Sequence, residues 1–316
     1  MSDRMRVGLN VANFAPPGGR ARLGPALAKV ARGAEDVGFE SFWLWDHFFW
    51  DQTPIGPGVT DREMIEAYTA LGFVAGVTRT IKLGTMVASA TYRHPGVLIK
   101  QVTALDLLSG GRAVFGIGAG WFEEEHRALG IPFPSVKERF ERLEETVRIA
   151  LQMWADEGKY DRARPFSGRH YRLERTLNVP QALQRPHPPI LIGGGGERKT
   201  LRLVAQYADA CNLDSRLSDD HLGHKLAVLR GHCERLGRPY EAIEKTLYGR
   251  LHVTRDGRGG SMSPPQAVDY CRMQADLGID TLILVDEKFN VYDPDFLDLW
   301  GGELIPAIQR LRVAGR

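Results

Sequence analysis

Cysteine is scarce in this 316-residue sequence, and its three cysteines form no pattern that binds a metal or builds a disulfide framework. Cys211, Cys233 and Cys271 are widely spaced, odd in number and in no CxxC pair. Isolated cysteines of this kind are most often buried, unreactive thiols. We therefore expect neither structural disulfides nor a zinc site.

Long apolar runs and an excess of charge of one sign are also missing. No stretch approaches the roughly 18 uninterrupted apolar residues of a membrane-spanning helix. The N-terminal MSDRMRVGLNVANF lacks the basic and apolar regions of a secretory signal. The net charge is only +2, so no charge excess indicates binding to nucleic acid or to a membrane surface. These absences predict a cytoplasmic protein with neither nucleic acid nor membrane as a partner.

What the sequence does contain is an alternation of short β-branched or aromatic runs with amphipathic helices, which is typical of parallel sheets with crossover helices. Most of these runs are apolar throughout, as strands covered on both faces are. Eight strands are predicted, at residues 6–11, 41–45, 81–88, 112–117, 189–193, 209–213, 246–253 and 281–285. We therefore expect an α/β protein with a (β/α)8 TIM barrel and insertion segments, with residues 1–316 forming a single domain.

The predicted helices carry apolar stripes and start signals. One stripe, spaced by three or four residues, consists of Phe140, Leu143, Val147, Leu151 and Trp154. Another consists of Leu222, Leu226, Leu229, Cys233 and Leu236. Capping signals are expected at Thr60 with Glu63, at Ser135 with Glu138, and at Ser263 with Gln266. These helices should pack their apolar faces on the barrel.

Two segments interrupt the rhythm. Residues 156–188 are polar, rich in arginine and proline, and far longer than a usual link between a helix and a strand. We predict that they form an insertion within the barrel domain. Residues 48–61 follow the second strand on the side where barrel active sites lie, and they either line a substrate entrance or form a surface loop.

Polar residues at the carboxyl ends of the strands are the candidates for chemistry in a barrel of this kind. Asp46 and His47 follow the second predicted strand. An adjacent carboxylate and imidazole can orient a cofactor ring and supply a proton at neutral pH. Spacing alone favours a structural histidine beside a helix-capping aspartate, but the position at a strand end favours the catalytic interpretation.

Two glycine-rich turns also follow predicted strands. Gly116, Gly118 and Gly120 allow close approach of a planar ligand or of a neighbouring strand, but Trp121 stands where a dinucleotide fingerprint needs its third glycine. The second turn, formed by Gly193, Gly194, Gly195 and Gly196, precedes a predicted helix. Unobstructed amide groups at a helix start bind phosphate, so we predict a phosphate site there, with a flexible turn as the alternative.

Two common barrel chemistries lack their residues. Lys82 and Lys245 stand at strand starts and no lysine ends a predicted strand, so Schiff-base chemistry has no nucleophile. Asn10 and Asn13 stand after the first strand where a metal-dependent hydrolase would have histidines. A phosphate-bearing organic cofactor remains, and we expect no metal site.

Several long segments resemble one enzyme family. The segments LGTMVASATYRHP, LDLLSGGRAVFGIGAGWFEEEHRALGIPFP, ERFERLEETVRIALQMW and PPILIGGGGERKTLRLVAQYADACNL are similar to luciferase-like F420-dependent oxidoreductases, and the likeness covers nearly the whole chain. The GWFEEEHRALGIPFP segment is the most specific. The resemblance implies a barrel, usually a homodimer, that binds the deazaflavin coenzyme F420 at the strand carboxyl ends and acts on a small-molecule substrate.

The resemblance also implies roles for individual residues. Asp46 and His47 would lie by the deazaflavin ring, with His47 exchanging a proton with the substrate. A non-prolyl cis peptide is expected between Met86 and Val87, beside the ring. The remaining cofactor-binding positions are expected at Ser89, Ala119, Gly120 and, for the phosphate, Gly193, Gly194, Gly195 and Gly196.

One departure from the family pattern concerns the substrate. Family members that act on a sugar phosphate have a carboxylate where this chain has Trp121, and here the acids come later, at Glu123, Glu124 and Glu125. The second acid–base residue is therefore not identified, and a sugar-phosphate substrate is disfavoured. An indole at this position suggests an apolar or aromatic substrate, or else a packing residue of the core.

The expected reaction is hydride transfer between F420 and a C=C, C=N or C=O bond, in either direction. An FMN-dependent monooxygenase of the same superfamily is the nearest alternative, because sequence separates the two cofactors poorly. A non-catalytic relative that only binds a cofactor is the second alternative.

Overall fold

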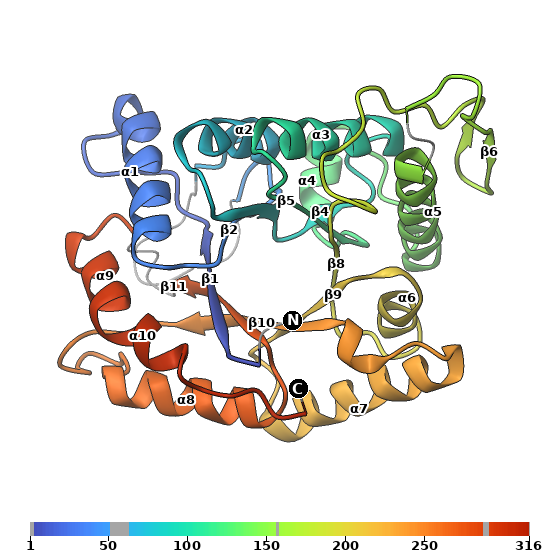
Figure 1. The fold of residues 1–316 in the computed structure, drawn as a ribbon. Helices are drawn as coiled ribbons and strands as arrows, with labels where there is room; N and C mark the ends of the chain where they lie inside the picture. The colour runs from blue at the N-terminus through green and yellow to red at the C-terminus, as the bar shows by residue number, and fades with distance from the viewer. Residues whose placement is uncertain (1–2, 51–62, 156–157, 287–290, 316) are drawn as a thin grey trace.

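The predicted strands form, and they pair in parallel around a closed barrel (Figure 1). The computed structural model describes residues 3–50, 63–155, 158–286 and 291–315. The strands of the barrel are β1 (Arg6–Val11), β2 (Ser41–Leu44), β3 (Lys82–Thr85), β4 (Ala88–Ser89), β5 (Ala113–Gly118), β8 (Ile190–Gly193), β9 (Ala210–Asp214), β10 (Glu244–Leu251) and β11 (Thr281–Asp286). Strands β3 and β4 share one position in the barrel, because both pair with β5. The molecule is therefore a (β/α)8 TIM barrel.

Burial explains why these segments are strands. Every residue of β2, β5 and β11 is buried, as is expected of a parallel sheet covered on both faces. Side chains alternate between the two faces. In and after β2, Trp43 and Trp45 belong to the cluster that fills the barrel interior, whereas Phe42 and Leu44 belong to the larger cluster between strands and helices.

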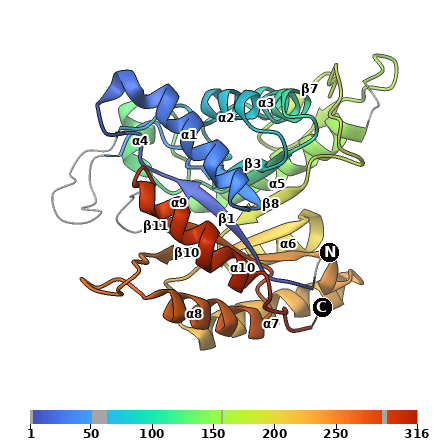
Figure 2. The same ribbon diagram turned by 60° about the vertical axis from the view of Figure 1, so that its left-hand side comes forward.

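Helices surround the barrel on its outside (Figures 1 and 2). They are α1 (Leu23–Asp36), α2 (Ala67–Val77), α3 (Pro95–Leu108), α4 (Glu123–Ala128), α5 (Val136–Ala155), α6 (Thr200–Tyr207), α7 (Asp219–Leu236), α8 (Pro264–Asp276), α9 (Pro294–Leu299) and α10 (Ile305–Ile308), with short helical turns η1 (Arg20–Arg22), η2 (Tyr240–Ala242) and η3 (Trp300–Leu304). Among these described elements, no helix has the length and apolar character needed to cross a membrane.

The predicted stripes face the barrel. In α5, Leu143, Val147 and Trp154 are buried, and Phe140 and Leu151 pack against the core. In α7, the stripe is buried from Leu222 to Cys233, while Leu236 is exposed. All three cysteines are buried and unbridged, as expected, and burial raises the pKa values of Cys211 and Cys271 to about 12.

The predicted helix starts are confirmed at two of the three positions. Ser263 and Gln266 form a capping box at α8, and Ser135 accepts the backbone N–H of Glu138 at the start of α5. Thr60 lies outside the described residues. Among the described residues, the helix after β2 begins at Ala67, where Glu66 provides the cap and accepts the N–H of Thr69.

Residues 158–188 leave the barrel and return along α3 and α5 (Figure 1). They contain a short antiparallel hairpin, β6 (Phe166–Ser167) and β7 (Arg172–Leu173). Glu145 of α5 accepts backbone N–H groups of the hairpin turn, and Asp106 of α3 accepts those of Leu183 and Gln184. Two buried carboxylates thus hold this excursion against the helices.

The two ends of the described chain lie side by side (Figures 1 and 2). Met5 donates its N–H to the carbonyl of Leu311, and Val313 donates to the carbonyl of Asp3, at 3.0 and 2.8 Å. This contact is at the amino end of β1. The two ends of the described chain therefore lie away from the opposite rim, where the strands end.

Candidate active site

Residues predicted from three different strand ends come together at the carboxyl rim of the barrel. Asp46 and His47 follow β2, Ser89 ends β4, and Gly120 follows β5. Gly120 has a φ of +78°, and a Cβ added to it would lie 2.3 Å from the Ser89 hydroxyl oxygen. Glycine is required there on both counts. The rim thus brings the ends of β4 and β5 into direct contact.

Asp46 is buried and forms a bidentate ion pair with Arg93, which sequence reasoning did not identify. The two N···O distances are 2.6 and 2.8 Å, and a second contact of 2.6 Å joins Arg93 to Glu66 at the start of α2. Burial raises the pKa of Asp46, and the Arg93 guanidinium opposes this shift. Asp46 does not cap a helix among the described residues, so the helix-capping role considered for it is wrong. Its carboxylate instead links β2 to the segment after β4.

His47 is held by Glu125, a residue of α4. The Nδ1 atom of His47 lies 2.8 Å from Oε2 of Glu125. The Glu125 side chain is fully buried, with 0% exposure, and it also accepts hydrogen bonds from the Tyr92 hydroxyl and the Phe48 backbone N–H. Of the three acids in this part of the sequence, Glu123 pairs on the surface with Arg127, and Glu125 contacts His47. Because Nδ1 contacts Glu125, Nε2 is the ring nitrogen of His47 that this contact does not engage.

Aromatic rings surround the His47 imidazole. The ring centroids of Trp50, Phe122, Trp121 and Trp45 lie 5.0, 5.7, 5.9 and 6.1 Å from it, all at steep interplanar angles. Trp121 is 63% exposed, so it is not a packing residue of the core. Residues 48–50 therefore line the site, whereas residues 51–61 of the same predicted loop lie outside the described residues.

A chain of hydroxyl groups connects Ser89 with a buried histidine, His126. Ser89 Oγ lies 2.6 Å from Thr91 Oγ1, which lies 2.6 Å from Nε2 of His126. The other nitrogen, Nδ1, lies 2.7 Å from the carbonyl oxygen of Phe122 and must carry its proton, because a carbonyl can only accept. Burial lowers the pKa of His126, which favours this neutral form. The Ser89 hydroxyl is therefore oriented by contacts within the protein.

The peptide between Met86 and Val87 is cis, as the resemblance implied. Val87 fills space that glycines leave open in the neighbouring strands. A Cβ at Gly118 or Gly193 would lie 2.9 or 3.0 Å from the Val87 side chain, and one at Gly116 would lie 1.9 Å from the Thr85 carbonyl oxygen. Of the two interpretations of the first glycine run, the approach of a neighbouring strand accounts for Gly116 and Gly118.

The second glycine run differs from the predicted arrangement. Residues 193–196 do not start a helix directly, since a turn at residues 197–199 separates them from α6. The N–H of Gly194 donates to the carbonyl of Asn212 at 3.0 Å and is therefore engaged within the sheet. Gly194 and Gly196 are exposed. A phosphate would have to be bound by amides that follow Gly194 in this turn.

Two buried polar atoms near the rim have no hydrogen-bond partner among the described residues. They are Oδ1 of Asn10, a residue of β1, and Nε1 of Trp50. Buried polar groups normally have partners in a complete structure. An acceptor and a donor in this position fit a bound planar heterocycle or a substrate with polar edges. Metal ligands are not indicated, because no cluster of three or more His, Cys, Asp or Glu side chains suited to a metal occurs in the described parts of the chain.

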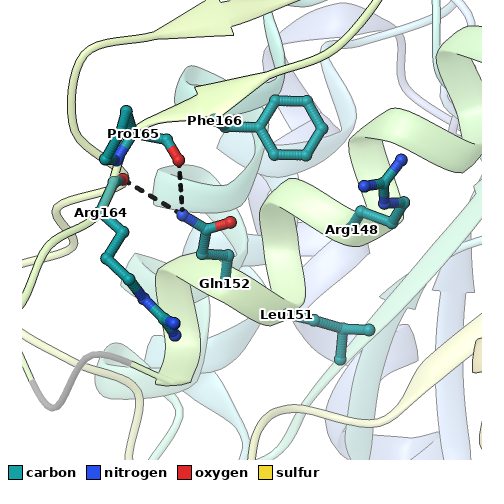
Figure 3. Close-up of a pocket in the computed structure, with 6 residues that line it drawn as sticks. All are labelled: Arg148, Leu151, Gln152, Arg164, Pro165 and Phe166. Carbon is teal, nitrogen blue, oxygen red and sulfur yellow. Dashed lines mark hydrogen bonds between the residues drawn. The ribbon is translucent and has the colours of Figure 1, made fainter.

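Two hollows lie away from these residues. One, of about 60 Å³, is at the amino end of the barrel, next to Trp43 and Thr246. The other, of about 430 Å³, is on the outer surface between α5 and the excursion, where Gln152 donates to the carbonyls of Arg164 and Pro165 (Figure 3). Neither includes a residue from the strand ends discussed above.

Comparison with known proteins identifies the family of this chain. A model of the luciferase-like monooxygenase family matches residues 5–258. The chain belongs to this family. This luciferase-like protein is 31% identical over 273 residues to the F420-dependent glucose-6-phosphate dehydrogenase of Kineococcus radiotolerans, which covers 85% of this chain and 72% of the relative. Like its relatives, it is an oxidoreductase.

Two other proteins that are similar to this chain are named for different cofactors, one for FMNH2 and the other for F420. The FMNH2-dependent dimethylsulfone monooxygenase of Pseudomonas putida is 30% identical over 181 residues, or 57% of this luciferase-like chain and 46% of the relative. The F420-dependent tetrahydromethanopterin reductase of Methanopyrus kandleri has a TM-score of 0.76 and 16% identity, covering 96% of this chain and 99% of that one. The latter likeness shows the fold.

Proposed function

We propose that this luciferase-like oxidoreductase uses coenzyme F420 and transfers a hydride between the deazaflavin and an apolar organic substrate, at a C=C, C=N or C=O bond or in the reverse direction. The supporting observation is the 31% identity, over 85% of the chain, with a relative named as F420-dependent. When bound, F420 supplies the hydride chemistry. The protein supplies binding, orientation and a proton.

The residues at the rim fit a planar cofactor. Ser89, Ala119 and Gly120 would contact its ring together with the Met86–Val87 peptide, and the unpartnered Oδ1 of Asn10 offers an acceptor close by. The amides that follow Gly194 in the glycine turn would bind its phosphate. Asp46 would keep Arg93 and the end of β2 in place, since both of its carboxylate oxygens accept hydrogen bonds from Arg93.

His47 is the residue proposed to exchange a proton with the substrate. Its Nδ1 is engaged by Glu125, and its Nε2 is the nitrogen that can act as acid or base. The surrounding rings of Trp45, Trp50 and Trp121 provide flat apolar surfaces beside the imidazole. These surfaces support an apolar or aromatic substrate rather than a sugar phosphate.

An FMN-dependent monooxygenase is the second candidate function, favoured by the 30% identity to the Pseudomonas putida enzyme. That match spans a smaller share of the chain than the F420-dependent relative does. The same rim would then hold FMN, and the reaction would consume oxygen instead of passing a hydride to an organic acceptor.

The deciding experiment is a titration of the purified protein with F420 and with FMN in parallel, followed by cofactor fluorescence. We expect tighter binding of F420. The variant Gly120→Ala should weaken binding, because its Cβ would press on Ser89, whereas Gly130→Ala is a matched control with a φ of +68° and no atom within 4 Å of the added Cβ. Preferential binding of FMN would favour the monooxygenase, and binding of neither would refute the proposed role of the rim.

A further inference from the structure

Glu125 is surrounded by hydrogen-bond donors. Its Oε2 faces Nδ1 of His47 at 2.8 Å and accepts from the Tyr92 hydroxyl, while its Oε1 accepts from the backbone N–H groups of Phe48 and Phe49. The side chain has no exposure to solvent. The two amides come from the segment directly after His47. The carboxylate is therefore anchored to the same loop as the imidazole that it contacts.

The hydrogen bonds of this cluster determine which atoms of Glu125, Tyr92 and His47 carry protons. Burial opposes ionisation of Glu125, but the hydrogen bonds from His47, Tyr92 and Phe48 outweigh it and lower the pKa of the carboxyl group. Burial and the nearby negative charge raise the pKa of Tyr92, so its hydroxyl keeps its proton and donates. An ionised carboxylate can only accept, so the contact with His47 requires a proton on Nδ1.

We infer that Glu125 is a positioning residue that holds His47 in the tautomer with a proton on Nδ1, so that Nε2 is the nitrogen that exchanges a proton during the reaction. In neutral His47, Nε2 is then an acceptor, and in the protonated form it is a donor. The same fixed ring can thus serve either direction of hydride transfer. The assignment of a reaction to Nε2 rests on the proposed function, but the tautomer itself does not.

The tautomer can be measured without cofactor or substrate. In protein labelled with 15N-histidine, two-bond correlations between the ring nitrogens and carbon-bound protons distinguish the two neutral forms, and the spectrum of His47→Gln identifies the His47 signals. At mildly alkaline pH we expect the proton of His47 on Nδ1. A proton on Nε2 in the wild-type protein would overturn the inference by itself, even if no variant folded.

The variant Glu125→Gln provides the sharper test. The amides of Phe48 and Phe49 should retain the side-chain oxygen, which turns the amide NH2 towards His47 Nδ1. Because that group donates, the tautomer should switch to a proton on Nε2. A His47 signal that keeps its proton on Nδ1 in this variant would show that another group sets the tautomer and would refute the role of Glu125.

Two further variants are matched controls. Glu123→Gln removes an acid of the same helix that pairs with Arg127 at the surface, and Tyr92→Phe removes one donor to Glu125 but keeps the carboxylate. Both should retain the wild-type tautomer.

Activity provides the second readout. Glu125→Gln should lower turnover by about 100-fold, within the range for loss of a correctly oriented acid–base group, while cofactor affinity changes little. Unchanged turnover despite a switched tautomer would refute the positioning role in the reaction. Failure of the wild-type protein to bind F420, with the expected tautomer in place, would refute the proposed function and leave the tautomer assignment standing.

Discussion

Charged side chains are buried at both ends of the barrel, but the groups that they contact differ. At the amino end, Arg112 and Lys245 are engaged mainly by backbone carbonyls and a neighbouring carboxylate. At the carboxyl end, Glu125 and His47 are engaged by each other and by short loop segments. The first arrangement joins secondary-structure elements to one another. The second holds side chains in a defined orientation.

Arg112 shows the amino-end arrangement most clearly. It lies just before β5 and donates to the carbonyl oxygens of Ala75, Thr78, Ile81 and Ser109 and to the Thr78 hydroxyl. Burial lowers its pKa. These contacts close the end of α2 and the end of α3 onto the barrel. In barrel enzymes the amino end serves stability and the carboxyl end serves catalysis, and the contacts of Arg112 fit the first of these roles.

Asp46 is an exception that refines the comparison. It lies at the carboxyl end, but its carboxylate is saturated by Arg93, which in turn contacts Glu66. In this respect it resembles the buried charges of the amino end. The contacts of a buried charged group therefore indicate its role better than its position along the strand does.

The largest expected effect is on catalysis. His47→Ala should reduce turnover by roughly 100-fold or more through loss of the proton donor or acceptor, and it should leave F420 affinity within a few-fold of wild type. Steady-state rates together with the fluorescence titration measure both quantities. Wild-type turnover with the true substrate would remove His47 from the mechanism.

A histidine at the opposite end is the matched control. His187 precedes β8, stacks on Trp154 with a centroid distance of 5.8 Å, and its Nδ1 lies 3.9 Å from Asp209. His187→Ala should lower the free energy of unfolding without changing turnover of the folded enzyme. A loss of turnover as large as that of His47→Ala would break the proposed division between the two ends.

The second largest effect should be on stability. Arg112→Met removes a guanidinium that satisfies four carbonyl groups, and it should lower the free energy of unfolding by about 3 kcal/mol, because buried acceptors are left unpaired. Urea unfolding followed by circular dichroism measures this change. Arg32→Met is the control, since exposed Arg32 makes a single bond to the carbonyl of Val77 at the same helix end. Equal losses for both variants would show that burial of Arg112 is unimportant.

The strand pattern and the family resemblance were sufficient to predict the barrel, because strands covered on both faces are apolar along their whole length. They also placed Asp46, His47 and the cis peptide at Met86–Val87. The start of α2 was missed because Glu66 is an unusual N-cap, selected by its contact with Arg93 as well as with the helix. Ser, Thr, Asp and Asn dominate capping statistics, so the sequence pointed to Thr60.

The partners of the site were harder to predict. Glu123, Glu124 and Glu125 are adjacent in sequence, and only the rotation of a short helix decides that Glu125 faces His47. Arg93 lies 47 positions from Asp46, and nothing in a single sequence encodes that pairing. One signal was available: Tyr92 and Arg93 lie in the segment that follows β4, where polar residues of barrels gather. Contacts between loops of different strands depend on tertiary structure.

The smallest expected effect concerns Glu35, which joins α1 to the start of β3 at the amino end. Its carboxylate accepts the backbone N–H groups of Arg79, Thr80 and Ile81, and although burial opposes ionisation, these hydrogen bonds lower its pKa from 4.5 to about 2. A pKa that is lower in the folded state means that the unfolded chain binds the proton more readily. The stabilisation is therefore complete above about pH 4.5 and is lost as the pH falls towards 2.

The variant Glu35→Gln should lower the free energy of unfolding by roughly 1 kcal/mol at neutral pH, and its difference from wild type should shrink on acidification. Urea unfolding at neutral pH and at about pH 3 tests this, with exposed Asp36→Asn as the control on the same helix. A difference that stays constant across this range would mean that the Glu35 side chain acts through packing. The buried charges that stabilise the amino end would then be Arg112 and the ion pair between Lys245 and Asp280, rather than the Glu35 carboxylate.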